Sequence, residues 1–330
     1  MIKQLLRSVR EYKKSSLLAP IFVAAEVVVE CVIPFVTAKL VNNIELGCDM
    51  PTLVKYGIIL VLLAATSLTF GVLAGHYCSI ASCGFAKNLR HDMYYAIQDF
   101  SFTNIDKFST SSLVTRLTTD VNNVQMSYMM IIRTAVRSPF MLIFSMVMAF
   151  TINAKMALIF LCTTPILAVG LVLIMTKAIP FFNRIFKRYD KMNESVEENI
   201  SGMRVVKSYV REDYEKEKFN RASDNVRSDF TKAEKIIAFN GPLMNFCVYA
   251  GLIAIYVFGS LTIINTPALL KWTELQSFMT YSFQMLMSLM MLSMIMVMII
   301  ISIASAKRIS EVLNEKSTIL SPDNAVMNVK

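Results

Sequence analysis

The sequence predicts an all-α membrane protein whose six long transmembrane helices extend beyond the bilayer into the cytoplasm. Of its 330 residues 55% are hydrophobic, and the mean hydropathy is positive, a composition too apolar for a soluble domain of this length. Only 17% of the residues are charged, and most of these lie between six apolar blocks. Each block contains the roughly 20 helical residues that cross a hydrocarbon core. We expect spans at Leu17–Val41, Leu53–Cys78, Gln125–Phe150, Met156–Phe182, Ile236–Ile264 and Leu275–Ile303.

The distribution of basic residues predicts the orientation of these spans. Most Lys and Arg residues lie in the N-terminal segment and in two long inserts, which follow the second and the fourth span. By the positive-inside rule, both termini and both inserts are therefore expected in the cytoplasm of a multi-pass plasma-membrane protein. The net charge of +9 is then a consequence of topology. Because the basic residues are interleaved with Asp and Glu, we expect no nucleic-acid partner.

Both inserts are predicted to be helical arms, at about residues 79–124 and 183–235. In the second arm an apolar residue recurs every three or four positions, which is typical of a helix with one apolar stripe. The stripe consists of Tyr189, Met192, Val196, Ile200 and Met203. About 17 helical residues project roughly 25 Å from the membrane. Gly202 is expected to end or bend this helix.

The first arm has the same predicted plan. A helix continues the second span from Ala81 to Phe100, the polar segment FTNIDKFSTSS reverses the chain, and LVTRLTTDVNNVQ returns to the membrane. Two arms of one layout suggest that both reach a common depth outside the membrane. The alternative is that the arms only pack on each other as a solvated helical bundle.

Three motifs of this chain resemble those of a known family, the membrane domain of ATP-binding cassette (ABC) exporters of the six-helix half-transporter kind. NIDKFSTSSLVTRLTTDVNNVQ (104–125) is similar to the first intracellular-loop motif of that family. ENISGMRVVKSYVREDYEKEKF (198–219) is similar to the second, and ASAKRISEVLNEKS (304–317) resembles the exit from the sixth span into a linker. The run IIRTAVRSPF resembles a bacterial multidrug-type subgroup that often forms heterodimers.

The resemblance implies a fold, a set of partners and a location in the bacterial cytoplasmic membrane. In that family two such membrane domains pair. For this chain the pair is a homodimer or a heterodimer, and the heterodimer is favoured. Two ATPase domains bind the tips of the arms. It implies tips near Asp106–Ser112 and Val206–Tyr214. The residues implied to couple to the ATPase domains are Asp106, Phe108, Ser109, Val206, Tyr209, Arg211, Glu212 and Tyr214.

ATP binding is not expected in this chain. It requires a Gly-rich loop that ends in Gly-Lys-Ser/Thr, and none of the ten glycines is followed by Lys. We therefore expect a membrane domain at residues 1–312, a linker at 313–330 and no catalytic or metal-binding residue in this chain. The ATPase domain, with its ATP and Mg²⁺, is expected beyond residue 330 of a longer chain, or else on a separate chain.

Charged residues within the spans are candidates for the substrate pathway, because charge in a membrane is costly and tends to mark function. Glu26 and Glu30 lie one turn apart in the first span, and Arg133 and Arg137 one turn apart in the third. Helical rise places the two pairs at similar depths, with Arg137 roughly 20 Å from the outer end of its span. The residues are therefore interpreted either as ion pairs between the two helices or as charges that hold ionic substrates.

The sixth span is rich in methionine, whose flexible side chain suits surfaces that accept varied apolar ligands. Lipid contact and core packing are the alternative explanation. Tyr281, Phe283 and Gln284 could add aromatic or polar contacts at the wall of a cavity.

Together these features predict the membrane half of an ATP-driven exporter for amphipathic small molecules, lipids or peptides. Two other classes stay open: an ion-coupled secondary transporter, for which Glu26 and Glu30 are the only deep carboxylates, and a regulatory or sensing membrane subunit.

Overall fold

The structure, a computed structural model, describes residues 2–265 and 270–317 and consists of two compact units. The first unit comprises the chain up to Ala157 together with the part that begins at Gly259, and the second comprises Leu158–Phe258. We describe each unit by itself.

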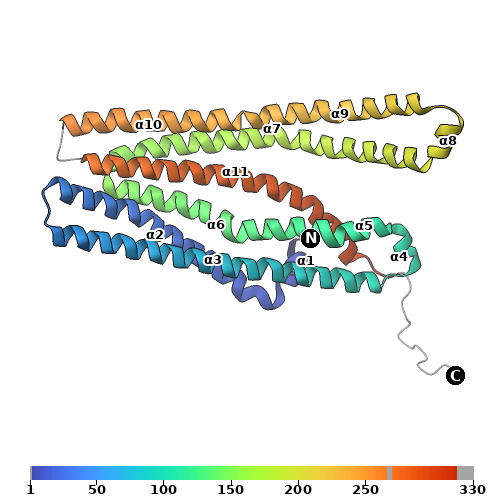
Figure 1. Cartoon of the computed structure of the whole chain (residues 1–330), viewed down its shortest axis with the longest axis horizontal. Helices are drawn as coiled ribbons and strands as arrows, with labels where there is room; N and C mark the ends of the chain where they lie inside the picture. Colours follow the sequence, from blue (N-terminus) through green and yellow to red (C-terminus); the bar gives the residue numbers. More distant parts are fainter. Residues whose placement is uncertain (1, 266–269, 318–330) are drawn as a thin grey trace, which may run out of the picture. The chain divides into compact units, whose positions relative to one another are not determined.

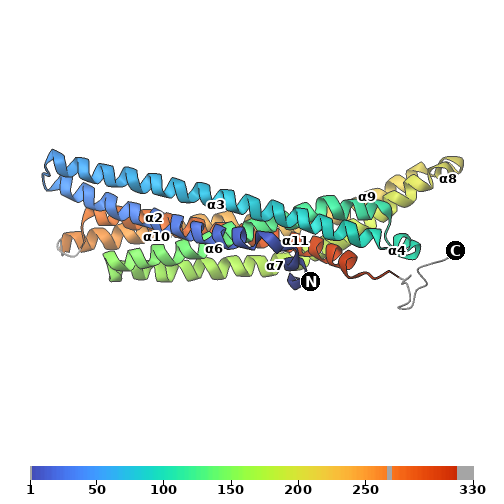
Figure 2. The same cartoon turned by 90° about the horizontal axis from the view of Figure 1, so that it is seen from below.

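Four long helices form the first unit: α2 (Lys13–Glu45), α3 (Met50–Gln98), α6 (Val121–Ile152) and α11 (Trp272–Asn314). Helix α2 packs on α3 and on α6, and α11 packs mainly on α6 (Figure 1). Helix α3 is a continuous rod of 49 residues (Figure 2), so the second span and the descending part of the first arm are one helix.

The second unit contains most of α7 (Ala154–Ser201) and of α10 (Asn240–Asn265), together with α8 (Met203–Ser208) and α9 (Glu212–Ala238). Helix α7 runs alongside α9 and α10, and α8 joins α7 to α9 at one end (Figure 1). The close approach of α7 to α10 is local: a Cβ on Gly170 of α7 would lie 2.5 Å from Leu243 of α10.

All six predicted spans are confirmed as helices that are long and apolar enough to cross a membrane, within the part of the chain that the structure describes. The fifth span lies at the junction of α9 and α10, where the helix is interrupted only at Phe239. The predicted break at Gly202 is also confirmed, since α7 ends at Ser201 and α8 begins at Met203.

The polar reversal of the first arm is more regular than the sequence indicated. It forms two short helices, α4 (Phe102–Lys107) and α5 (Thr110–Thr115), followed by the π-helical turn η2 (Arg116–Asp120) that leads into α6. Asn104 allows α4 to form there, because its side-chain oxygen accepts from the backbone N–H of Ser101 in a capping box. Of the expected linker, residues 318–330 lie outside the described residues.

The largest buried apolar cluster of the first unit lies in the first arm. It joins Phe85, Leu89 and Met93 of α3 to Phe108 and to Ile309 of α11. The N-terminal helices α1 (Ile2–Leu5) and η1 (Leu6–Tyr12) pack against the same region. The arm thus has a hydrophobic core of its own outside the predicted spans.

Gly84 shows how closely the N-terminal segment lies against α3. The ring of Tyr12 rests on this glycine, where a Cβ would meet ring carbons at 2.5 Å. Ser8 and Arg10 of η1 hydrogen bond to Asp92 of α3. The segment is therefore fixed to α3 by both packing and charge.

Candidate functional site

Glu26 and Glu30 of α2 form one ion-pair cluster with Arg137 of α6. Its guanidinium donates from Nη1 to Oε1 of Glu26 and from Nη2 to both carboxylate oxygens of Glu30, each at 2.7 Å. The two glutamates lie one turn apart and so face α6 together. One arginine therefore neutralises part of the charge of both carboxylates, and the two helices do not form two separate ion pairs.

Gly71 of α3 provides space for this cluster. A Cβ at that position would lie 3.2 Å from Oε1 of Glu26, so the carboxylate packs directly against the backbone of α3. The other oxygen of Glu26, Oε2, is buried and has no hydrogen-bond partner in the described part of the chain. Gly71 is thus a contact for a carboxylate, whereas Gly75, one turn further along α3, faces open space.

Arg133 lies one turn before Arg137 on α6 but does not share its partners. Its side chain is exposed, and within residues 2–265 and 270–317 its guanidinium forms no hydrogen bond or ion pair. Glu26 and Glu30, the only carboxylates that the sequence places deep in a span, are both bound by Arg137. The two arginines, equivalent in the sequence, are therefore distinct in the structure.

Both arginines line a groove of about 690 Å³ between α6 and α11. Its other lining groups are mostly flexible apolar side chains with a few hydroxyl and amide groups, which is the usual make-up of a small-molecule site. The methionines that line it are Met129, Met130, Met141, Met287 and Met291. Among the described lining residues there is no carboxylate.

The two candidates of the sixth span have different positions. Gln284 lines the groove, and its Oε1 accepts a hydrogen bond from Ser145 of α6 at 3.3 Å. Tyr281 is fully buried, and its hydroxyl donates to the carbonyl of Cys31 in α2 at 2.8 Å. Tyr281 thus connects α11 to α2 and does not contribute to the groove. Phe283, half exposed, is the aromatic residue at the groove wall.

The tip of the first arm consists of helix α4 and the turn that follows it, and of the three coupling residues implied here two are exposed and one is buried. Asp106 is exposed, as expected for a contact residue. Phe108 is buried, where it stacks on Phe100 at 5.8 Å between ring centres. Ser109 caps α5 by accepting a hydrogen bond from the backbone of Ser112. Phe102, with 83% of its surface exposed, is the more exposed of the two large apolar residues on the surface of α4, the other being Ile105.

This first tip is tied to the end of α11. The side-chain amide of Asn104 donates to Glu315 at 3.0 Å and to the carbonyl of Lys316 at 3.1 Å. Lys107 donates to Glu315 at 2.8 Å, and this contact, followed by that of Asn104, lowers the pKa of the Glu315 carboxyl. The tip and the residues that leave the sixth span are therefore linked directly.

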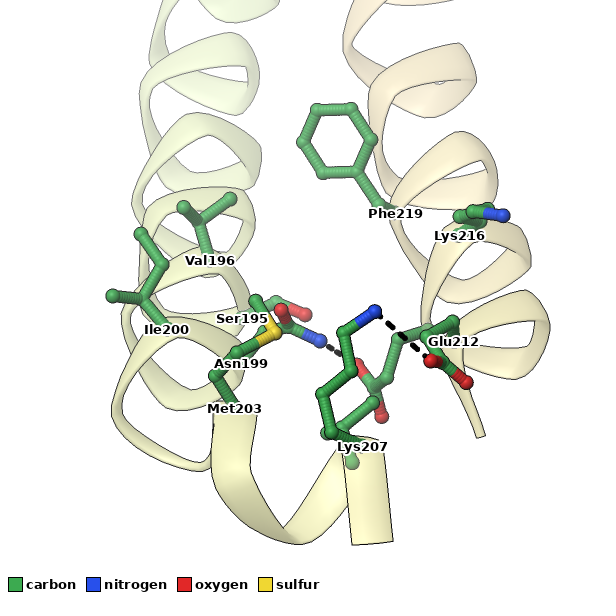
Figure 3. Close-up of a pocket in the computed structure, with 11 residues that line it drawn as sticks. Ser195, Val196, Asn199, Ile200, Met203, Lys207, Glu212, Lys216 and Phe219 are labelled. Carbon is green, nitrogen blue, oxygen red and sulfur yellow. Dashed lines mark hydrogen bonds and ion pairs between the residues drawn. The ribbon is translucent and has the colours of Figure 1, made fainter. Parts of the chain in front are cut away.

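The tip of the second arm is helix α8, which closes one end of a groove of about 480 Å³ between α7 and α9. Figure 3 shows the ring of Phe219 in the space between the two helices. Two hydrogen-bonded contacts cross this end: Lys207 to Glu212 at 3.0 Å and Asn199 to Glu215 at 3.0 Å (Figure 3). The groove is thus lined by apolar side chains and framed by charges.

The predicted coupling residues of this second tip are mostly exposed. Tyr209 exposes 75% of its surface and Tyr214 exposes 61%. Arg211 is also exposed, whereas Val206 and Glu212 are half-buried at the groove. A hydrogen bond with its own backbone N–H, followed by that from Lys207, lowers the pKa of the Glu212 carboxyl.

The chain leaves α8 through a turn that is unusual for its residue type. The N–H of Arg211 donates to the carbonyl of Val206 at 3.0 Å and that of Val210 to Lys207 at 3.3 Å, the pattern of a Schellman motif. Such motifs place a left-handed residue after the helix, normally glycine, yet here Val210 has a φ of 51°. A β-branched residue in this region is strained, and Val210 is also 81% exposed.

Sequence reasoning missed the exposed apolar residues Phe102 and Val210. Phe102 lies just before the first motif, which begins at Asn104, and Val210 lies inside the second motif but outside the implied set of coupling residues. Phe102 could have been found from the capping box at Ser101, which predicts a helix and hence an outer face opposite Asn104. For Val210 the sequence gives no signal, because no glycine or asparagine marks the left-handed position.

Comparison with known proteins agrees with this architecture. The family described as ABC transporter transmembrane region matches residues 16–289. An uncharacterized ABC transporter ATP-binding protein of Mycobacterium tuberculosis is 27% identical over 325 residues, which is 98% of this chain and 56% of the relative. The uncharacterized ABC transporter ATP-binding protein YfiB of Bacillus subtilis is 28% identical over 251 residues, covering 75% of this chain and 44% of the relative.

A further relative, the fatty acid ABC transporter ATP-binding/permease protein of Mycobacterium bovis, is 27% identical over 246 residues, 73% of this chain and 38% of the relative. The chain spans about half the length of the curated relatives it matches. Six helices of this length and hydropathy, within the residues that the structure describes, define a multi-pass membrane protein. The chain belongs to the ABC transporter transmembrane-region family.

Proposed function

We propose that this chain is the membrane-spanning half of an ATP-driven exporter and that ATPase domains act on it through the tips of its two arms. The cargo is an amphipathic small molecule, a lipid or a peptide that enters the pathway from the cytoplasm or the inner leaflet. Both termini and both arms lie in the cytoplasm, and the protein resides in the plasma membrane. It acts as a dimer with a second half-transporter, and a heterodimer is favoured.

The observation that carries this proposal is the exposure of large apolar residues on short helices at the ends of both arms. Phe102 on the first tip and Tyr209 on the second are more than 70% exposed. Large exposed aromatic side chains are typical of residues that anchor protein–protein interfaces. The tips therefore have the form of docking elements for a cytoplasmic partner.

The arms have the stiffness that a lever requires. In the second arm the guanidinium of Arg188 on α7 donates to the carbonyl of Asn225 on α9 at 2.9 Å and pairs with the buried carboxylate of Asp229 at 3.2 Å. Lys218 of α9 pairs with Glu198 of α7 at 3.0 Å. A displacement of α8 is thus transmitted toward the membrane along two helices that ion pairs and a hydrogen bond hold together, as in rigid-body switching between two states.

ATP and Mg²⁺ are assigned to the partner ATPase domains. A phosphate site needs clustered backbone N–H groups and a lysine in a Gly-Lys-Ser/Thr loop, and no glycine of this chain precedes a lysine. The residues of this chain thus receive motion from ATP binding and do not hold the nucleotide.

The groove between α6 and α11 is the proposed binding site for the cargo. Its methionines and Phe283 suit an apolar body of variable shape, and its arginines and Gln284 suit a polar end. The fatty acid transporter among the relatives supports lipid-like cargo.

The test uses the full-length protein together with its ATPase domains and its partner half, reconstituted in liposomes. ATP hydrolysis and ATP-driven movement of candidate amphiphiles are measured in the same vesicles. We expect amphiphile-stimulated, vanadate-sensitive ATPase activity. Tyr209→Ala should reduce transport about 10-fold or more while basal hydrolysis persists, because an interface anchor is lost.

Tyr94→Ala is the matched control, since Tyr94 is a similarly exposed tyrosine on the shaft of α3. It should leave both activities unchanged. Transport that needs a proton gradient and ignores ATP would contradict the proposal and favour an ion-coupled transporter. Unaltered coupling in the Tyr209 variant would contradict the role of the second tip.

A further inference from the structure

The groove between α6 and α11 is not purely apolar, and the charged side chains that line it are all positive. Arg133 and Arg137 line it, and the described lining residues include no carboxylate. Arg137 is held by Glu26 and Glu30, whose carboxylates lie on α2 and outside the groove lining. Arg133 is therefore a guanidinium at the groove wall without an acceptor in the described part of the chain.

An unpaired guanidinium within a membrane span is costly, and such residues usually mark a ligand or a functional partner. The five donors of arginine match carboxylate and phosphate groups in two-pronged hydrogen bonds. An ion pair within the chain would require an acidic residue in reach of Arg133. The two deep carboxylates of α2 are bound by Arg137 instead, with both oxygens of Glu30 and one of Glu26 engaged.

The position of Arg133 also fits one end of a lipid-like molecule. It lies 17 residues before Phe150, or about 26 Å along the helix axis, whereas the hydrocarbon core is about 30 Å thick. Arg133 is thus near one edge of the hydrocarbon layer. From it the groove continues along α6 past three polar residues, Thr134, Arg137 and Ser138, to Met141. On α11 it is lined by the apolar residues Met287, Met291 and Phe283. An amphiphile would place its head at Arg133 and its tail along the methionines.

We propose that this groove selects amphiphiles with a single anionic head group, a carboxylate or a phosphate, and that Arg133 binds that head group. The inference rests on the proposed function, because it names the class of cargo for the same groove. It makes Arg133 a specificity-determining residue, and it assigns Arg137 the role of neutralising α2.

Four probes with one tail test this assignment: oleate, oleyl phosphate, oleyl alcohol and oleylamine. Binding of each labelled probe is measured with the full-length protein and its ATPase domains in nanodiscs of neutral lipid. We expect the better-bound anion to exceed oleyl alcohol by about 10-fold or more, the usual value of hydrogen bonds to a charged group, and oleylamine to bind most weakly. The tighter of the two anions identifies the head group.

Variants locate the effect. Arg133→Gln should remove the preference for the anion and leave oleyl alcohol binding unchanged, which also reports that the groove is intact. Arg133→Lys should retain part of the preference, since it keeps the charge but loses the two-pronged geometry. Lys177→Gln, which removes an exposed cation from the fourth span, should change nothing.

Equal binding of anionic, neutral and cationic probes, or unchanged oleate and oleyl phosphate binding in Arg133→Gln, would overturn the inference. ATP-driven transport of neutral amphiphiles with no role for Arg133 would overturn it while the proposed function survives. Arg133-dependent binding of an anion without ATP-driven movement of any compound would do the reverse.

Discussion

In the first arm the tip residues hydrogen bond to Glu315 and Lys316, which follow α11, and contribute Phe108 to a buried cluster, whereas in the second arm α8 closes one end of the groove between α7 and α9. Asn104 and Phe108 point inward in the first arm, and the buried Asp120 pairs with Arg308. The ion pairs around the second tip, such as Lys207 with Glu212, are largely exposed to solvent.

This difference indicates that the two tips have different mechanical properties. The first tip has its own hydrophobic core and is fixed to the chain that leaves the sixth span. The second has exposed apolar residues and weak surface ion pairs, so we expect it to open more easily than the first. The predictions below test this contrast, beginning with the largest expected effect.

Phe108→Ala should lower the free energy of unfolding by about 3–5 kcal/mol, because it leaves a cavity in the core of the first arm. Phe102→Ala is the matched control six residues earlier: its ring is 83% exposed, so stability should change by less than about 0.5 kcal/mol. Chemical unfolding of the purified protein measures both. Equal losses would mean that the first tip is not held by its core.

Asp120→Ala should lower the free energy of unfolding by about 2–3 kcal/mol. The substitution removes the buried carboxylate that pairs with the guanidinium of Arg308. The loss in free energy is smaller than for a fully buried pair, because Arg308 is 48% exposed. The double change Asp120→Leu with Arg308→Met should recover most of the loss. In the second arm, Asp213→Ala should have no measurable effect, since that carboxylate is 97% exposed.

Val210→Gly should stabilise the second tip by about 1 kcal/mol, because glycine adopts the left-handed conformation without the Cβ clash. Val205→Gly, within α8, should destabilise the same helix by about 0.5 kcal/mol, since glycine is a poorer helix former than valine. Hydrogen exchange of the α8 amides measures both signs. If both substitutions loosen α8, Val210 is not strained.

The ion pair at the second tip should weaken in acid. The pKa of Glu212 is lowered in the folded chain from its ordinary 4.5, so its contribution is complete above about pH 4.5 and is lost as pH falls through the lower folded value. Exchange protection at the end of α8 should therefore decrease below pH 4.5. Glu212→Gln should remove this pH dependence, and its persistence there would assign it to another group.

Much of the fold could be predicted from the sequence, because its signals are local. Hydropathy over 20 residues identifies a span, and a period of 3.6 residues identifies an arm. Gly202 was correctly predicted to break the helix. The helical character of the first tip was missed, since its helices α4 and α5 are too short to show a period.

The candidate site was predictable only as a set of residue types. Glu26, Glu30, Arg133 and Arg137 were found because charge within an apolar run is conspicuous. Which arginine pairs with the carboxylates depends on how α6 is rotated about its axis relative to α2. The spacing of residues within either helix does not determine this rotation. For the same reason Tyr281 was placed with Gln284, although only Gln284 lines the groove.

The sequence by itself determined the membrane spans, the two arms and the break between α7 and α8, since each follows from the properties of consecutive residues. Only the tertiary structure decided that Phe108 is buried and Phe102 exposed, and that Arg137 is paired while Arg133 is not. These outcomes depend on contacts between residues more than 100 positions apart, such as Arg137 with Glu26 and Glu30. Such contacts are set by how whole helices pack, and helix packing is a property of the assembled chain.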